Sequence, residues 1–251
     1  MNRIFNKDIF SHTKIRWHFG VSFLFCVFSF HVHGQGDFQD DVRVFYGNEI
    51  TGSIGAYTNG FSIGGRYAHR KFALEKYIFE FQAASIHHPK EIKIPADVGS
   101  RLVYGKSNST FTFMFSYGKQ LEKYSKLDKG SVAVRYIPFG GFALALEKPY
   151  YYVVDVEKNL YERFDASTTT KFGKAPFHVG IDEVTFVPGV FLGASINFEF
   201  SNQNMYIQAL EFGANIQMYA RPLEIMHENK NQMIFPTLFV IYRYGKALTK
   251  R

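Results

Sequence analysis

The sequence predicts an all-β protein, an antiparallel transmembrane β-barrel of about eight strands that follows a cleaved signal peptide. Three observations predict this fold. Apolar and polar residues alternate with a period of two over most of the chain after residue 49. Aromatic residues make up 18% of the chain and gather on the apolar faces. The connections alternate between short and long, as in bacterial outer-membrane barrels.

The N-terminal segment, residues 1–34, reads as a secretory signal peptide. It carries four basic residues and one acidic residue, and residues 21–30 form an apolar centre. That centre is too short to cross a bilayer comfortably as a helix, which disfavours an uncleaved membrane anchor. We expect cleavage near Gly34 and export to the bacterial outer membrane.

Composition excludes several classes of protein. With 46% hydrophobic residues the chain has enough apolar content for a folded core, and one cysteine excludes a disulfide scaffold. The net charge is +7, of which the signal segment supplies +3, so the remainder carries +4. This mild charge, without a run of five or more basic residues, predicts no nucleic-acid partner.

Eight runs of period two follow a polar lead-in at residues 35–48. The runs cover residues 50–57, 61–70, 77–83, 110–118, 131–146, 190–200, 210–218 and 233–244. Asn59-Gly60 predicts a tight turn between the first two. Pro138–Gly141 suggests a bulge in the fifth. The domain prediction is therefore a barrel over residues 49–246, followed by a basic tail at 247–251.

A soluble barrel and a membrane barrel share this alternation, so further features must separate them. Tyrosines near strand ends suit the interfacial girdles of a membrane barrel. The opposite faces carry Gly, Ser, Asn and few charges, whereas a solvated face is normally more charged. Connections after the second, fourth and sixth strands are shorter than those after the third, fifth and seventh. These features favour the membrane barrel. The tyrosines in question are Tyr77, Tyr117, Tyr136 and Tyr219.

The polar face predicts a lumen filled by side chains, because eight strands leave little open bore. Opposite charges inside should pair, since an unpaired buried charge is costly. Polar neighbours on the same face are Gln82, Asn197, Asn215 and Gln217. The candidate lumen charge network consists of Arg66, Glu80, Arg135, Glu199 and Glu211.

A long connection at residues 147–189 is predicted to lie outside the membrane and to offer a contact surface for a protein partner. The alternative is that Tyr150–Val156 extends the fifth strand and pairs with Val184–Val187. The candidate contact residues are Tyr150, Tyr151, Tyr152, Tyr161 and Phe164.

Catalytic and metal-binding motifs are weak. His87 and His88 are adjacent, and side chains of neighbouring residues on extended backbone point apart, so they do not form a metal site alone. Ser85 and His87 share a face, yet no acid is positioned to orient the histidine. We therefore predict no catalytic residue, no metal and no cofactor.

Four short motifs stand out: His88-Pro89-Lys90-Glu91, Lys148-Pro149-Tyr150-Tyr151-Tyr152, Gly180-Ile181-Asp182-Glu183 and Pro188-Gly189. With them the chain resembles uncharacterised outer-membrane β-barrel proteins of Bacteroidota-type bacteria, over about residues 45–246. The resemblance implies a fold and an outer-membrane address, and it transfers no activity and no catalytic residue. Some small barrels of such bacteria look like accessory subunits of secretion or assembly machines, and the resemblance implies a role of this kind.

The functional prediction is a non-enzymatic structural or accessory subunit of an outer-membrane complex, with outer-membrane lipid and a protein as its partners. Three alternatives remain open: a narrow solute channel, a lipid-modifying barrel enzyme and a soluble lipocalin-like binder.

Overall fold

The computed structural model describes residues 47–72, 74–96, 101–126, 130–158, 160–164, 172–201, 205–227 and 231–248. All of them belong to one compact unit that spans Phe45–Arg251. The predicted signal peptide at 1–34, most of the lead-in at 35–48 and most of the basic tail at 247–251 lie outside the described residues.

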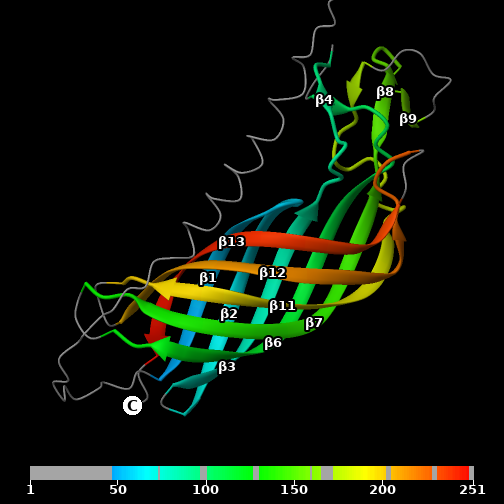
Figure 1. The fold of residues 1–251 in the computed structure, drawn as a ribbon. Coiled ribbons are helices and arrows are strands. Elements are labelled where there is room, and N and C mark those ends of the chain that lie inside the picture. The colour runs from blue at the N-terminus through cyan, green and yellow to red at the C-terminus, as the bar shows by residue number, and fades with distance from the viewer. Residues whose placement is uncertain are drawn as a thin grey trace, which may run out of the picture. The chain divides into compact units, whose positions relative to one another are not determined.

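Eight long strands form a closed antiparallel barrel (Figure 1). Each strand pairs with the next long strand along the chain, and β1 pairs with β13 to close the cylinder. The predicted fold class is therefore confirmed. The strands are β1 (Asn48–Tyr57), β2 (Gly60–Phe72), β3 (Glu75–Ile86), β6 (Asn108–Tyr124), β7 (Ala133–Pro149), β11 (Thr185–Glu199), β12 (Tyr206–Leu223) and β13 (Gln232–Leu248).

The barrel is apolar outside and polar inside. Outward residues such as Phe61 and Phe142 expose 72% and 73% of their surface, whereas inward Glu211 and Arg243 expose 1% and 2%. A water-soluble barrel would bury its apolar face instead, since burying apolar surface is the main driving force of folding in water. The arrangement is that of a transmembrane β-barrel, in which closure leaves no unpaired strand edge facing lipid.

The two ends of the barrel differ in their connections. At one end, here called the turn end, β1 begins, β13 ends, and connections span residues 73–74, 125–132 and 200–205. At the other, the loop end, a two-residue turn is accompanied by connections over residues 87–107, 150–184 and 224–231. The predicted alternation of short and long connections is confirmed, and both chain ends of the barrel lie at the turn end.

Two local predictions are wrong. The first hairpin turns at Thr58-Asn59, one residue earlier than predicted, because Tyr57 pairs with Gly60. Gly60 is a strand residue, and a Cβ there would lie 1.9 Å from the backbone oxygen of Ser85. β7 contains no bulge at residues 138–141, since its pairing with β11 runs in unbroken register through that stretch.

The connection at 147–189 is not one irregular loop, because β7 and β11 extend into it and its middle forms a small sheet. We call this sheet "the cap", together with the cap hairpin, the short strand pair β4–β5 that packs against it, and the residues that flank these strands (Figure 1). Tyr150–Val156 does not pair with Val184–Val187, because β8 pairs with β9 and β10 while Val187 pairs with Ala145. The cap strands are β4 (Lys93–Ile94), β5 (Leu102–Val103), β8 (Tyr151–Asp155), β9 (Leu160–Arg163) and β10 (Gly173–Lys174).

Among the described residues, no helix is long and apolar enough to cross a bilayer.

Candidate functional site

Four charged side chains meet in the centre of the lumen, and we call them the central network. Arg66 on β2 donates to Glu80 on β3 at 2.7 Å and to Glu211 on β12 at 2.9 Å. Arg243 on β13 contacts the same two carboxylates, at 2.7 Å and 2.6 Å. Each arginine bridges both glutamates, so two positive and two negative charges alternate and cancel.

Neutral donors complete the central network. Ser195 Oγ and Asn197 Nδ2 donate to Glu211 at 2.8 Å and 3.2 Å. Gln82 Nε2 donates to Glu80 at 2.7 Å and in turn accepts a hydrogen bond from the Tyr57 hydroxyl. Buried ion pairs recover their desolvation cost only when the remaining lone pairs and protons are also bonded. The network comes close to meeting this condition.

A second set of charges, the lower network, lies nearer the turn end. Arg135 on β7 pairs with Glu199 on β11 and lies 3.4 Å from Glu122 and 3.7 Å from Glu49. Lys76 pairs with Glu49. A further lysine, Lys126, donates to Glu199 at 2.8 Å. Three positive and three negative groups again cancel.

The structure divides the five predicted lumen charges between these two networks. Arg66, Glu80 and Glu211 meet in the central network, and Arg135 meets Glu199 in the lower one. Sequence reasoning missed the fourth central member, Arg243, and four lower members, Glu49, Lys76, Glu122 and Lys126. The sequence did contain a signal for Arg243. Outward residues of β13 alternate with inward ones, and Arg243 falls on the inward set.

Apolar side chains fill the lumen toward the loop end. Phe139 packs against Phe191 and Phe239 at ring-centroid distances of 6.2 Å each. Tyr219, predicted to face lipid, is buried here instead, and its hydroxyl contacts Thr112 and Gln217 at 3.0 Å and 2.8 Å. Odd-numbered residues of β12, such as Gln217, face the lumen. The alternation of the strand therefore places Tyr219 inside as well.

A cavity between the two networks measures only about 10 Å³. Its lining includes Arg66, Arg135, Asn197 and Arg243. A volume of this size holds about one water molecule. Along the described strands, the lumen is therefore occupied successively by the lower network, the central network and the apolar cluster.

The cap has its own core, which corrects part of the predicted contact surface. Tyr152 is completely buried and Tyr150 nearly so, packed with Leu102 and Phe164. The Tyr152 hydroxyl donates to the backbone oxygen of Val103 at 2.6 Å. Burial raises the pKa of both tyrosines. These two residues hold the cap together and present no surface to a partner.

The other predicted contact residues lie nearer the cap surface. Tyr151 and Tyr161 are half-buried, as is Phe164. The Tyr151 hydroxyl donates to Glu183 at 2.8 Å, and Glu183 also pairs with Arg163. The hydrogen bond from Tyr151, then that from Arg163, lower the pKa of the Glu183 carboxyl. Glu183 is thus fixed within the cap by its own chain.

A buried ion pair anchors the cap hairpin. Lys106 Nζ donates to Glu91 at 2.8 Å, and both side chains are almost completely buried. Burial lowers the pKa of Lys106, and the Glu91 carboxylate opposes that shift. The same lysine forms a backbone bridge with Met226 of the connection between β12 and β13. The pair therefore lies where the cap hairpin meets a second loop-end connection.

The described histidines do not assemble a site. The His88 ring accepts a hydrogen bond from the backbone of Lys90 at 3.2 Å, and Ser85 Oγ contacts the backbone of Phe61. No group of three or more His, Cys, Asp or Glu side chains within the described ranges is arranged to hold a metal ion.

No protein-family model matches this chain, and neither does any curated protein. One solved structure that is similar to it is the crystal structure of Neisserial surface protein A, with 8% sequence identity and a TM-score of 0.44. The match covers 80% of this chain and 96% of that one. The resemblance to a Bacteroidota family stays a prediction.

Proposed function

We propose that this chain is an exported outer-membrane protein that serves as a non-enzymatic structural or accessory subunit of an outer-membrane complex. The turn end faces the periplasm and the cap projects outward, in keeping with the short periplasmic turns and longer outer loops of such barrels. One observation carries the proposal: the chain combines a filled lumen with a folded cap that exposes apolar side chains.

The lumen offers little to a transported solute. Two charge-balanced networks and an apolar cluster occupy it, and the cavity between the networks holds about one water molecule. Opening a path would require breaking several buried ion pairs, each costly to separate. A supporting role fits this interior better than conduction.

The cap, in contrast, exposes apolar residues beyond the barrel. Ile92, Phe177 and Ile181 expose half or more of their surface, and no membrane covers them in the proposed orientation. Clusters of exposed apolar side chains on a folded surface mark interaction sites. The cap is held by its own core and by the Lys106–Glu91 pair, so it presents this surface in a fixed form.

The test is the native size of the protein in mild-detergent extracts of outer membranes. We expect the wild-type chain to migrate within a complex well above the size of the single barrel in its detergent micelle. The triple variant Ile92→Ser, Phe177→Ser and Ile181→Ser should migrate as the single barrel.

The matched control places the same change at the turn end, in Tyr124→Ser, Val132→Ser and Met205→Ser, which are also exposed apolar residues. This variant should stay in the complex. A wild-type chain that migrates alone, or equal loss in both triple variants, would contradict the proposal. Recovery of the chain in the soluble periplasmic fraction would contradict the membrane assignment itself.

A further inference from the structure

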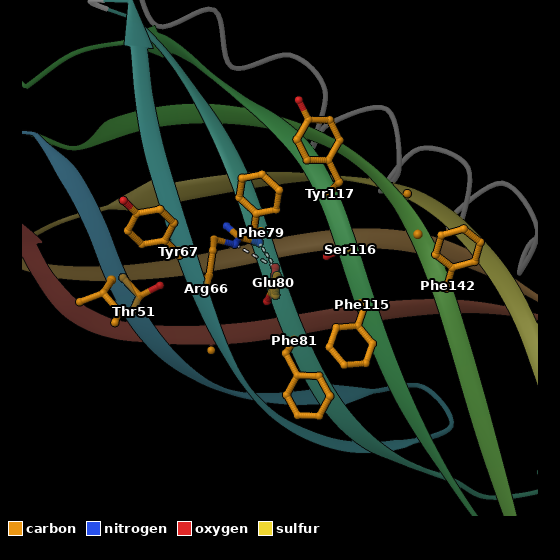
Figure 2. Close-up of a pocket in the computed structure, with 14 residues that line it drawn as sticks. Thr51, Arg66, Tyr67, Phe79, Glu80, Phe81, Phe115, Ser116, Tyr117 and Phe142 are labelled. Carbon is orange, nitrogen blue, oxygen red and sulfur yellow. Dashed lines mark hydrogen bonds and ion pairs between the residues drawn. The ribbon is translucent and has the colours of Figure 1, made fainter.

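The outer wall of the barrel contains a hollow of about 610 Å³, on the faces of β1, β2, β3, β6 and β7 (Figure 2). Small-molecule sites typically measure about 300–1,000 Å³. Its walls are outward-facing Ile50, Tyr67, Phe79 and Phe81, among others. Arg66 and Glu80 reach the opposite, inner face of the same strands, so the hollow belongs to the lipid-facing surface and not to the lumen.

One glycine of the hollow's lining, Gly65, has an outward glycine partner on the neighbouring strand. Gly52 on β1 and Gly65 on β2 are directly paired and both face outward. A Cβ at Gly65 would meet nothing closer than 3.8 Å, and one at Gly52 nothing closer than 3.9 Å. Inward Gly64 differs, because a Cβ there would lie 2.5 Å from the backbone oxygen of Phe81. Barrel packing thus requires Gly64 but requires neither outward glycine.

Glycine inside a strand weakens it, by about 0.5–1 kcal/mol relative to alanine. Gly52 and Gly65 carry this cost without relieving a clash within the chain. Gly65 leaves depth in the wall beside Phe81, with which it pairs, and Gly52 places no side chain between Gly65 and Tyr244 of β13.

Aromatic rings form one side of the hollow. Phe79 packs against Tyr117 with ring centroids 5.2 Å apart, and Phe81 against Phe115 at 4.8 Å. Figure 2 shows these four rings projecting from β3 and β6 on the same side of the sheet. A hollow with such walls, facing the hydrocarbon layer, suits a hydrocarbon chain and offers few polar partners for a peptide.

Cations lie at the turn end of the hollow. Lys246 on β13 pairs with Ile50 and is exposed, and Lys71 on β2 is also exposed. Six residues, or about 20 Å along the strand, separate Lys71 from Gly65. The nearby Glu75 is paired with Lys119 at 2.8 Å, so three lysines accompany one glutamate on this rim. Lysines near the bilayer surface attract anionic head groups.

We propose that the hollow holds an acyl chain of an anionic glycerophospholipid whose phosphate lies at Lys246 and Lys71. The apolar walls bind the chain, and the cations select the charge of the head group. The inference rests on the proposed orientation, in which the turn end meets the periplasmic leaflet. In the opposite orientation the same cations would meet lipid A.

The experiment is native mass spectrometry of the purified full chain in detergent, incubated with equal amounts of dioleoyl phosphatidylglycerol, dioleoyl phosphatidylcholine and lipid A. We expect one phosphatidylglycerol retained on the wild-type barrel. The variant Gly52→Leu/Gly65→Leu places one large side chain in the hollow, at Gly65, and a second beside it, and should lose at least about nine-tenths of this adduct. The variant Lys71→Gln/Lys246→Gln should lower the preference for phosphatidylglycerol by at least roughly fivefold, as expected from even one lysine at a head group.

The matched control is Ala194→Leu/Ala214→Leu, a directly paired set of outward small residues on β11 and β12. It adds the same two side chains elsewhere on the wall and should keep the adduct. Equal retention in the filled and control variants, or equal retention of both glycerophospholipids by the wild type, would overturn the proposal. So would retention of lipid A in preference to phosphatidylglycerol, or a second copy of the chain in place of lipid.

Failure of this test is distinguishable from failure of the proposed function. The heat-dependent gel shift of each variant shows whether the barrel is closed, and the lysine variant leaves the hollow unchanged. Loss of the lipid adduct also leaves the cap, and hence the native complex, as they were.

Discussion

Arg243 and Glu80 lie 163 positions apart in the chain, and their side chains meet at 2.7 Å in the centre of the barrel. The contact joins β3 to β13, which are separated along the wall by β2 and β1. It exists only when β1 and β13 are paired, since β1 lies between β2 and β13. The central network is therefore a consequence of barrel closure.

Removing one central carboxylate should strongly destabilise the barrel. In Glu211→Gln, two buried arginines share the single carboxylate of Glu80, and breaking a buried pair in this way typically costs about 3–5 kcal/mol. We expect a lower urea midpoint for the loss of the folded gel band in micelles. Glu75→Gln, which removes an exposed partner of Lys119, should change stability by less than about 1 kcal/mol. Equal midpoints for the two variants would contradict the assignment.

Planar bilayers containing the wild-type protein should show no discrete conductance steps. The lower network, the central network and the Phe139 cluster all occupy the lumen, and the cavity between the networks holds about one water molecule. A porin inserted under the same conditions verifies the recording. Steps in the wild type whose size changes in Glu80→Ala would restore the solute-channel alternative.

Glycines of the first hairpin should differ in their tolerance of a methyl group. In Gly60→Ala the new Cβ meets the Ser85 backbone oxygen at 1.9 Å, and forced overpacking costs about 1–3 kcal/mol. In Gly52→Ala the new Cβ finds open space, so stability should stay the same or rise slightly. Refolding yield into micelles and the urea midpoint check this. A Gly60→Ala barrel as stable as the wild type would refute the close approach.

The cap should lose stability in alkali before the barrel does. Burial in the closed cap raises the pKa of Tyr150 and Tyr152. Above pH about 10, the ordinary tyrosine pKa, the two phenols therefore ionise only in the open cap, and this favours opening as the pH rises. Lys106 acts in the opposite sense: burial lowers its pKa, so the closed cap gains stability as the pH rises toward the ordinary lysine value. Above about 10.5 the lysine contribution is constant, and the tyrosines decide.

Tyrosinate absorbance checks this expectation. The difference between the wild type and Tyr152→Phe isolates one phenol, which should ionise together with opening of the cap, reported by protease cleavage near residues 155–160. Ionisation of Tyr152 at its ordinary pKa in an uncleaved cap would show that the residue is exposed.

Much of the barrel could be predicted from its period of two. Alternation in residues 61–70 alone separates inward Arg66 from outward Tyr67, because neighbouring strand side chains point oppositely. The same rule placed Glu80, Arg135, Glu199 and Glu211 on the polar side. It could not say which of them meet, because pairing depends on register and on closure between distant strands.

The errors arose where periodicity carried little information. Tyr219 was assigned to the lipid face from its residue type, although it is odd-numbered like inward Gln217 and so belongs to the lumen set. The strands of the cap contain only two to five residues, too few for alternation to be visible. Burial of Tyr150 and Tyr152 depends on packing with Leu102, nearly fifty residues earlier, which no local pattern reveals.

The central network also bears on how the barrel is assembled. Arg66 and Glu80 face each other on the hairpin of β2 and β3, and Glu211 and Arg243 lie on the hairpin of β12 and β13. Each hairpin carries a neutral pair of its own before the two meet. The two cross-contacts, Arg66–Glu211 and Arg243–Glu80, form only when the last strands reach the first ones, so they add their stabilisation at the closing step of assembly.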